Sequence, residues 1–374
     1  MKRPVINSDS GSLYVGTLPL GCQLCHRGQK LVLFIGGKCS NPKRCSWYCP
    51  ISERRKGSDL IFADEILANG PKDIIEEAKL IKAFGASITG GDPLFNEDQR
   101  ELSLFYIEEL KNEFGDSFHI HLYTSGVNFT PLIADDLMEA GLDEIRFHPA
   151  EKDFHRIQYA LDRGMRVGAE VPVIPTPEHE EYLWNLIDYL DNIGVDFVNF
   201  NEFEMNEPNH KELLKRGFKI KEDSIASVEG SKELAYKILT ELPDRYTISV
   251  HFCSVALKDG TQLRNRYKRR AESIKYPYEE VTKDGTLIFL RVSGTIDQVN
   301  RLYAQLRRKI RIPKSMMALT EDSGKLSLDL PWFLSEDENS MRLIKDNKVS
   351  GGLYEILPFR RAELYEVCEF TPIL

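Results

Sequence analysis

Short apolar runs alternate with helical patterns between residues 30 and 253, and this alternation limits the possible folds more than any other feature of the chain. A strand followed by a helix is a βα unit, and consecutive units build a parallel sheet. About six units in a row predict an α/β fold with a full or partial TIM-type (β/α) barrel, whose active site lies at the carboxyl ends of the strands. The predicted strands cover residues 31–35, 86–89, 119–123, 144–147, 166–173, 197–200 and 246–252.

The predicted helices between these strands have clear boundary signals. Thr130 and Thr176 each place a capping hydroxyl before a proline at the first helical position, and the two helices are expected to stop at Gly141 and Gly194. Another helix is expected to open at Gly70-Pro71. Its apolar residues have amphipathic spacing and are Ile74, Ile75, Ala78, Ile81 and Phe84.

The regular alternation stops near residue 256, which predicts a change of domain. We expect an N-terminal extension with a CxxC pair at 1–29, the barrel core at 30–255, a basic helix and linker at 256–284, and a small α+β accessory domain at 285–374. A basic run is usually a solvated helix face, although this one is also a candidate site for RNA phosphates. Its arginines are Arg264, Arg266, Arg269 and Arg270.

Composition favours an enzyme without a membrane anchor. The chain has 374 residues, 42% of them hydrophobic, which is enough for one large core or two moderate ones. No window approaches the roughly 20 consecutive apolar residues of a membrane helix, and the N-terminus lacks the apolar segment of a secretory signal. Five of the seven cysteines lie between positions 22 and 49. This crowding favours metal ligation in a reducing cytoplasm over a disulfide framework.

Three cysteines and a glycine-rich turn follow the first two predicted strands. Cys39, Cys45 and Cys49 come after the first strand, and Gly90-Gly91-Asp92-Pro93 comes after the second. Three thiolates on one loop can hold three corners of a cubane iron-sulfur cluster, which leaves one iron open to chelate an amine and a carboxylate. Other polar residues are expected at the same mouth because they also end predicted strands: Thr124, Ser125, Arg146, His148, Glu170, Asn201 and Glu202.

These two motifs resemble those of the radical S-adenosylmethionine (radical SAM) superfamily over about residues 30–255. The loop reads Cys39-SNPKR-Cys45-SWY-Cys49, and the turn corresponds to the GGEP-like motif that contacts the methionine part of SAM. The loop spacing, Cx5Cx3C, departs from the usual Cx3Cx2C, but loops tolerate added residues at a modest entropic cost. The segments GCQLC, KLVLFIGGKC and GAEVPVIP are most similar to archaeal proteins related to pyruvate formate-lyase activating enzyme.

The resemblance implies a cofactor set and a chemistry. Cys39, Cys45 and Cys49 would bind a [4Fe-4S] cluster, while Gly90, Gly91, Asp92 and Pro93 would contact SAM. Tyr48 would lie near the adenine, and Ser125 and Glu170 would contact the ribose or the carboxylate. The enzyme would cleave SAM reductively and use the 5′-deoxyadenosyl radical to abstract a hydrogen atom from a protein, a cofactor precursor or an RNA. A ferredoxin or flavodoxin would supply the electron.

Two other functions remain open at this stage. The cysteines could be structural ligands of zinc in a metal-stabilised binding protein. Alternatively, the chain could be an iron-sulfur electron-transfer protein, in which the glycine-rich turn would have no explained role.

A second group of cysteines lies outside the radical SAM motif. Cys22 and Cys25 form a CxxC pair, which is half of a tetrahedral metal site, and Cys253 is the preferred third ligand. His251 is a suitable fourth ligand in type, and His26 is a less favoured one. The site would hold zinc or a second iron-sulfur cluster, the latter with help from Cys368. Reduced thiols without a metal, or a redox dithiol, are the alternatives.

Overall fold

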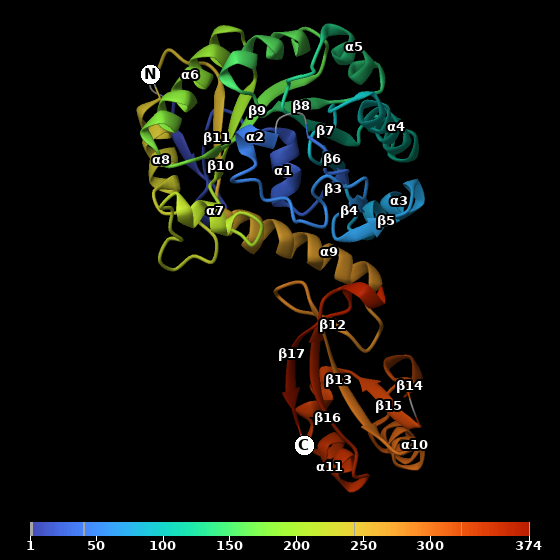
Figure 1. The fold of residues 1–374 in the computed structure, drawn as a ribbon. Coiled ribbons are helices and arrows are strands. Elements are labelled where there is room, and N and C mark those ends of the chain that lie inside the picture. Colours follow the sequence, from blue (N-terminus) through green and yellow to red (C-terminus); the bar gives the residue numbers. More distant parts are fainter. Residues whose placement is uncertain (1–2, 40–41, 243, 323, 374) are drawn as a thin grey trace. The chain divides into compact units, whose positions relative to one another are not determined.

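The computed structural model describes residues 3–39, 42–242, 244–322 and 324–373, and it divides into two compact units, Met1–Leu263 and Arg264–Leu374. The first unit is an α/β structure built on one large mixed sheet of eleven strands (Figure 1). Within the described ranges, no helix combines the length and the hydropathy that crossing a bilayer requires.

Seven parallel strands form the centre of this sheet and are paired in chain order. They are β3 (Lys30–Ile35), β6 (Gly85–Thr89), β7 (His119–Thr124), β8 (Glu144–Phe147), β9 (Arg166–Val173), β10 (Phe197–Glu202) and β11 (Ser249–Cys253). All seven predicted strands are therefore present, and six of them begin within one residue of the predicted position.

Antiparallel strands flank the parallel ones on both sides. The strands β1 (Val5–Asn7) and β2 (Leu13–Val15) extend the sheet beyond β11, while β4 (Ile61–Ala63) and β5 (Ile66–Ala68) extend it beyond β3. Among the described residues no pairing joins β5 to β1, so the sheet forms an open, partial barrel and not a closed one.

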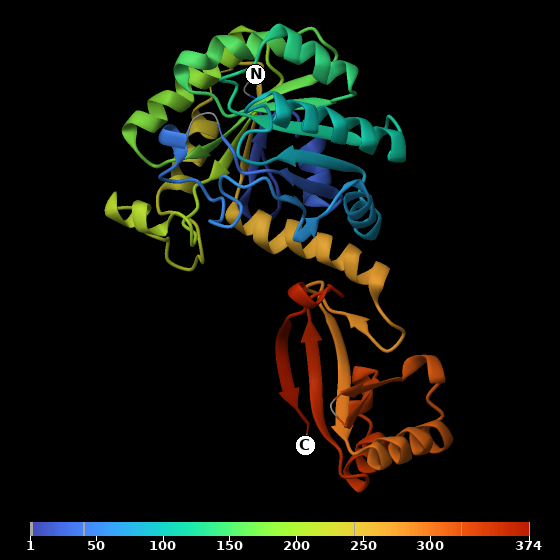
Figure 2. The same ribbon diagram turned by 45° about the vertical axis from the view of Figure 1, so that its right-hand side comes forward.

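Helices cover the outer face of the curved sheet, as both ribbon views show (Figure 1, Figure 2). Thr130 and Thr176 cap their helices as predicted, since their side chains accept hydrogen bonds from the amides of Ile133 and His179. Phe84 was expected on the buried face of the helix after Gly70, and this was wrong because its side chain is 58% exposed. The helical segments of this unit are η1 (Asp9–Gly11), α1 (Leu20–His26), α2 (Pro42–Cys45), α3 (Pro71–Leu80), α4 (Glu97–Phe114), α5 (Pro131–Glu139), η2 (Glu151–Ala160), α6 (Pro177–Asn192), α7 (His210–Lys215), α8 (Ser231–Glu241) and η3 (Leu257–Leu263).

Side chains along the parallel strands alternate between the helix layer and the lumen of the barrel. On β10, Val198 and Phe200 belong to the main apolar core, whereas Asn199 and Asn201 line an internal cavity. A strand places successive side chains on opposite faces. The outer face of the sheet therefore supplies the core, and the inner face supplies the polar groups of the site.

Helix α1 lies on the inner side of the sheet and occupies the lumen (Figure 1), where it contacts β3, β6, β7 and η3. Gly21 permits this position: a Cβ atom on that residue would lie 2.7 Å from both Arg146 Nη2 and His121 Nδ1. The CxxC pair of α1 is thereby carried into the interior of the barrel.

The second unit contains an antiparallel sheet in the order β14-β15-β13-β16-β17, with β12 paired to β13. Its strands are β12 (Glu280–Val281), β13 (Leu287–Gly294), β14 (Ala318–Asp322), β15 (Lys325–Leu330), β16 (Ser350–Ile356) and β17 (Val367–Pro372). Its helical segments are α9 (Arg264–Ile274), α10 (Ile296–Gln305), η4 (Leu306–Ile310), η5 (Lys314–Met316), η6 (Trp332–Ser335), α11 (Glu338–Asp346) and η7 (Ala362–Leu364). Residues of α10 and α11, among them Leu302 and Ile344, pack into the apolar core of this unit.

The basic helix α9 is not simply a solvated cationic face. Arg270 is 5% exposed, its guanidinium donates a hydrogen bond to the carbonyl of Pro358, and it lies 4.4 Å from the centre of the Phe359 ring. The expectation that this arginine is available to RNA phosphates was therefore wrong.

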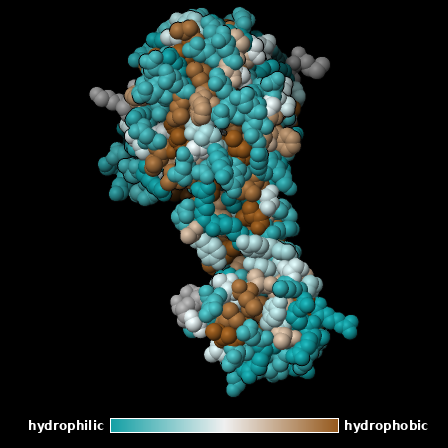
Figure 3. Space-filling view, turned by 90° about the vertical axis from the view of Figure 1, so that its right-hand side faces the viewer, coloured by the Kyte–Doolittle hydropathy of each residue, from teal (hydrophilic) through white to brown (hydrophobic). Residues whose placement is uncertain are grey.

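Figure 3 shows one side of the molecule, on which hydrophobic residues form separate small areas among hydrophilic ones.

Candidate functional site

The glycine-rich turn after β6 is bonded to the chain that leads into the cysteine loop. The amide of Gly91 donates to the carbonyl of Gly36 (2.8 Å), and the amide of Asp92 donates to that of Lys38 (2.7 Å). A Cβ atom on Gly91 would lie 2.0 Å from the Lys38 carbonyl oxygen. Only glycine allows two backbones to approach this closely. The first two βα turns are therefore locked together beside Cys39.

The three cysteines of the loop are electrostatically coupled. A hydrogen bond with Cys39, together with burial, raises the pKa of the Cys45 thiol. Burial, with a smaller contribution from Cys39, raises the pKa of the Cys49 thiol. Thiols that disfavour one another's ionisation this way become good ligands once a soft metal neutralises them.

A cavity of about 410 Å³ opens beside the cysteine loop at the carboxyl ends of the strands. Seven of the residues predicted to bind the cluster or SAM line it, namely Cys39, Cys45, Gly90, Gly91, Pro93, Ser125 and Glu170. Tyr48 lies next to this cavity and lines two neighbouring ones, of about 640 and 220 Å³. Seven of the ten residues predicted to bind the cluster or SAM thus meet at one mouth, whereas Tyr48 lies at its side and Cys49 and Asp92 do not line it.

Asp92 joins two successive turns. Its Oδ1 accepts hydrogen bonds from Thr124 Oγ1 (2.9 Å) and from the Leu94 amide (3.0 Å). Its Oδ2 accepts hydrogen bonds from the Ser125 amide (3.2 Å) and from Ser125 Oγ (2.5 Å). The buried carboxylate therefore fixes the glycine-rich turn against the exit of β7, and it orients the Ser125 hydroxyl.

Glu170 presents a permanent negative charge at the base of the cavity. Burial opposes this charge, but the Arg146 guanidinium and the amides of Asn201 and Asn199 lower the pKa of Glu170 to about 2. Arg146 Nη1 lies 2.7 Å from Oε2, and Asn201 Nδ2 lies 2.9 Å from Oε1. An ionised carboxylate accepts hydrogen bonds only, so it suits hydroxyl groups better than another carboxylate.

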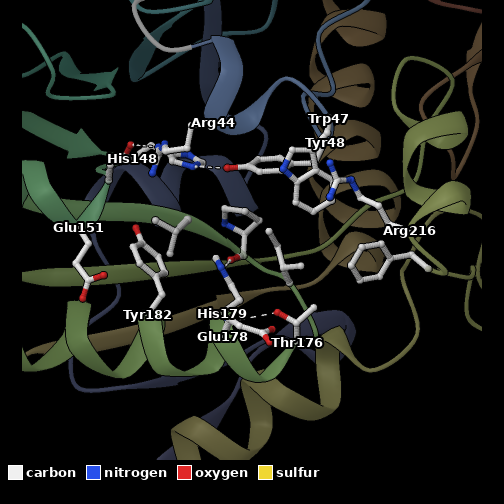
Figure 4. Close-up of a pocket in the computed structure, with 15 residues that line it drawn as sticks. Arg44, Trp47, Tyr48, His148, Glu151, Thr176, Glu178, His179, Tyr182 and Arg216 are labelled. Carbon is white, nitrogen blue, oxygen red and sulfur yellow. Dashed lines mark hydrogen bonds between the residues drawn. The ribbon is translucent and has the colours of Figure 1, made fainter.

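Tyr48 and Arg44 connect the cysteine loop to the end of β8 (Figure 4). Tyr48 Oη lies 3.0 Å from His148 Nε2, and Arg44 donates hydrogen bonds to the carbonyls of His148 and Pro149 at 2.5 Å each. These contacts hold the aromatic residue before Cys49 at the side of the cavity.

His148 provides a test by pH. Burial, with a smaller contribution from the charge of Arg44, lowers the pKa of His148 to about 3. The unfolded chain takes up a proton as pH falls below about 6.5, whereas the folded protein does not, so folding stability is lost in acid. We expect His148→Gln to reduce this loss by about 1–2 kcal/mol between about pH 6.5 and about pH 4.5, the effect being moderated by partial exposure. Denaturant midpoints measured across this range for both proteins check the prediction, which equal slopes would contradict.

The second group of predicted ligands also meets in space. Cys22, Cys25 and Cys253 line an internal cavity of about 220 Å³ together with His26 and His251. Cys368 lies on β17 of the other unit, where it is exposed. All seven cysteines are free thiols.

Two cations of the site were missed in the sequence. Lys30 lines both the 410 Å³ cavity and the internal 220 Å³ cavity that Cys22 and Cys25 line. Arg44 lines the 410 Å³ cavity and the 640 Å³ one. A signal for Lys30 was present, since it shares a strand face with Val32, which also lines the larger cavity. Arg44 had no such signal, because its partners are about a hundred residues away in the chain.

Comparison with known proteins gives one strong match in sequence. No family model matches the chain. A protein of Methanocaldococcus jannaschii that bears the name "Putative glycyl-radical enzyme activating enzyme" is 40% identical over 283 residues, which cover 72% of each chain.

Solved structures match only weakly. SuiB of Streptococcus suis bound to S-adenosylmethionine has a TM-score of 0.40 at 13% identity, over 70% of this chain and 56% of SuiB. The radical S-adenosylmethionine methyltransferase TsrM of Kitasatospora setae, with tryptophan and a SAM analogue bound, has a TM-score of 0.33 at 12% identity, over 71% of this chain and 56% of TsrM. The chain thus spans little more than half the length of each of these two structures.

Proposed function

Because this chain belongs to the radical SAM superfamily, as a relative of the archaeal protein named as a glycyl-radical enzyme activating enzyme, we propose that its substrate is a protein and that it abstracts a hydrogen atom from a glycine Cα of that protein. The enzyme uses a [4Fe-4S] cluster and SAM. The observation that carries the proposal is 40% identity to this relative over most of both chains. Family membership also disfavours the zinc-binding and electron-transfer alternatives.

The residues at the mouth fit the cluster. Three electrostatically coupled thiols lie on one loop, and soft thiolates are the ligands that iron-sulfur clusters prefer. Cys39, Cys45 and Cys49 would hold it. When bound, the cluster supplies the electron that splits SAM into methionine and a 5′-deoxyadenosyl radical.

The protein groups around the cavity would position SAM. Gly90 and Gly91 would offer backbone atoms to its methionine part, and Asp92 would act through the turn that it holds. The Ser125 hydroxyl and the Glu170 carboxylate would contact the ribose, because an ionised Glu170 repels the carboxylate of SAM. Tyr48 and Pro93 would border the adenine and methionine ends, respectively. In the reaction, one hydrogen atom moves from the glycine Cα to the 5′ carbon, and the unpaired electron stays on glycine.

A groove of about 640 Å³ lies next to the SAM cavity, and Figure 4 shows residues that line it. It would suit a polypeptide substrate. It shares Arg44 and His148 with that cavity. Its walls are largely aromatic and apolar, and charged side chains are also present at Glu151, Glu178 and Arg216. Apolar grooves with a few polar groups are typical of ligand-binding sites.

A ferredoxin or flavodoxin is the proposed reductant. The cytoplasm is the proposed location, because thiolate ligands need a reducing compartment.

Deuterium transfer tests the protein substrate. Cells of the source organism would be grown on glycine deuterated at Cα, and their anaerobic extract separated by ultrafiltration into macromolecules and filtrate. After addition of the purified enzyme, dithionite and SAM, we expect the macromolecular fraction to yield deuterated 5′-deoxyadenosine. This product should be lost when the fraction is first treated with protease and retained when it is treated with ribonuclease. Deuterium obtained from the filtrate, or lost after ribonuclease treatment, would overturn the proposal.

A matched pair of variants tests the groove. Phe218 lines it, whereas Phe105 is exposed on α4. Phe218→Ala is expected to reduce deuterium transfer about tenfold or more, the cost of losing one buried aromatic contact. Phe105→Ala should leave transfer unchanged, and neither variant should alter SAM binding. Equal transfer by the two variants would exclude the groove as the substrate path.

A further inference from the structure

The internal cavity of about 220 Å³ gathers metal-binding side chains that the radical SAM site does not use. Cys22 and Cys25 are three residues apart on α1, and His251 and Cys253 are two apart on β11, so each pair presents both members to one side. We propose that this cavity holds a second iron-sulfur cluster, bound by Cys22, Cys25, Cys253 and His251. The inference concerns a different site from the SAM cavity and does not depend on the substrate.

Hydrogen bonds around three of these four residues are those expected of metal ligands. Asn199 Nδ2 donates to Cys22 Sγ at 3.2 Å, and Asn199 Oδ1 lies 3.3 Å from His251 Nδ1. Asn199 thereby fixes the proton of His251 on Nδ1 and leaves the lone pair on Nε2. Gln262 Nε2 donates to Cys253 Sγ at 3.8 Å. Partners of this kind orient ligands and stabilise thiolates in metal sites.

His251 is the ligand that points to a missing partner. Its side chain is 2% exposed, and within the described part of the chain Nε2 has no hydrogen-bond partner. Leaving a buried polar atom unsatisfied costs about 1–3 kcal/mol. Coordination of a metal by Nε2 removes that cost.

Cations in the wall of the cavity would lie beside an anionic group. Arg146 is paired with Glu144 and Glu170, and Lys258 is paired with Glu204. Lys30 also lines the cavity, but no described residue forms a salt bridge with it, and Cys25 is its main favourable electrostatic neighbour. A [4Fe-4S] cluster with three thiolates and one neutral histidine carries a net charge of about −1 in its oxidised form. Lys30 would lie beside that charge.

The geometry favours a cluster over a single ion. Thiolates around one zinc ion lie roughly 3.8 Å apart, since each Zn–S bond is about 2.3 Å. Among the described residues, the ligand atoms that lie within 4.8 Å of one another in groups of three or more are those of His119, His121 and Glu144. At least two of the sulfurs of Cys22, Cys25 and Cys253 are therefore more than 4.8 Å apart. The cavity has the volume of roughly seven water molecules.

The group of His119, His121 and Glu144 is a weaker candidate for a metal site. Arg146 Nε donates to Glu144 Oε1 at 2.6 Å, so a guanidinium already neutralises the carboxylate. Its positive charge opposes a divalent cation at the same place.

Iron counting separates the two clusters. The variant with Cys39, Cys45 and Cys49 all replaced by alanine would be reconstituted anaerobically with ferrous iron and sulfide, and its iron, sulfide and zinc measured by mass spectrometry and colorimetry. We expect about four iron and four sulfide atoms per chain in this variant, and about eight of each in the wild type. Adding Cys25→Ala and Cys253→Ala should remove the remaining iron, whereas adding Cys368→Ala should not. A triple variant without iron, or with zinc in its place, would overturn the proposal.

The histidine ligand has a spectroscopic test that does not require a disrupted site. Pulsed electron paramagnetic resonance of the reduced triple variant should show hyperfine coupling to a histidine nitrogen. His251→Cys in the same background keeps four ligands, and it should abolish that coupling and lower the reduction potential, because thiolate ligands stabilise the oxidised cluster relative to histidine. Unchanged nitrogen coupling in His251→Cys would exclude His251 as the ligand.

Discussion

A triple variant in which alanine replaces Cys39, Cys45 and Cys49 is expected to lose the reductive cleavage of SAM. The three thiols lie on one loop beside the 410 Å³ cavity, and the pKa of the Cys45 thiol is raised chiefly by a hydrogen bond with Cys39, which places these sulfurs close together. Removing all three leaves iron without its soft ligands at this site. The measurement is 5′-deoxyadenosine formed by anaerobically reconstituted protein with dithionite and SAM, which should fall to the background without enzyme.

The control is Cys368→Ala, since that thiol is exposed on β17 of the other unit. It should retain full SAM cleavage. Product formation decides the test and brown colour does not, because a second cluster would keep the triple variant coloured. Deoxyadenosine from the triple variant at the wild-type rate would show that the loop does not hold the catalytic cluster.

The ends of a parallel strand could be predicted from the sequence where the buried residues of that strand determine them. Residues 144–147 and 166–173 matched β8 and β9 at both ends, since all of β8 and five of the eight residues of β9 are buried. The last strand was predicted from residue 246, but β11 begins at Ser249. The amides of Thr247 and Ile248 donate to Asp191 Oδ1 at 2.7 and 2.8 Å, so a side chain takes the place of the neighbouring strand. The sequence around Thr247 and Ile248 does not indicate that Asp191 is their partner.

The position of α1 could not be predicted for a similar reason. The segment is only seven residues long, and its place in the lumen depends on contacts with residues far away in the chain. Gly21 lies against Arg146 and His121, and Cys22 accepts a hydrogen bond from Asn199, 177 residues away. The sequence indicated that Cys22, Cys25 and Cys253 belong together by type. Their meeting inside the barrel follows from the fold.

Replacement of Gly91 by alanine is expected to damage the site strongly. The added Cβ would lie 2.0 Å from the Lys38 carbonyl oxygen and 2.6 Å from the Gly37 carbonyl carbon, and both contacts are with backbone, which cannot rotate away. The turn and the start of the cysteine loop must separate. We expect the free energy of unfolding to fall by about 1–3 kcal/mol. SAM affinity, measured by anaerobic calorimetry, should fall by about a hundredfold or more, since each 1.4 kcal/mol is a tenfold change.

Gly70→Ala is the matched control for this substitution. Gly70 is extended, with a φ of 167°, and a Cβ atom there would meet nothing within 4 Å. Both variants add one methyl group to a glycine before a βα-unit helix, but only one of them forces two backbones apart. Loss of SAM affinity in Gly91→Ala with unchanged affinity in Gly70→Ala would assign the effect to this close approach. Wild-type affinity in a folded Gly91→Ala protein would mean that the turn can yield without moving the residues that bind SAM, and the proposed role of Gly90 and Gly91 would then be wrong.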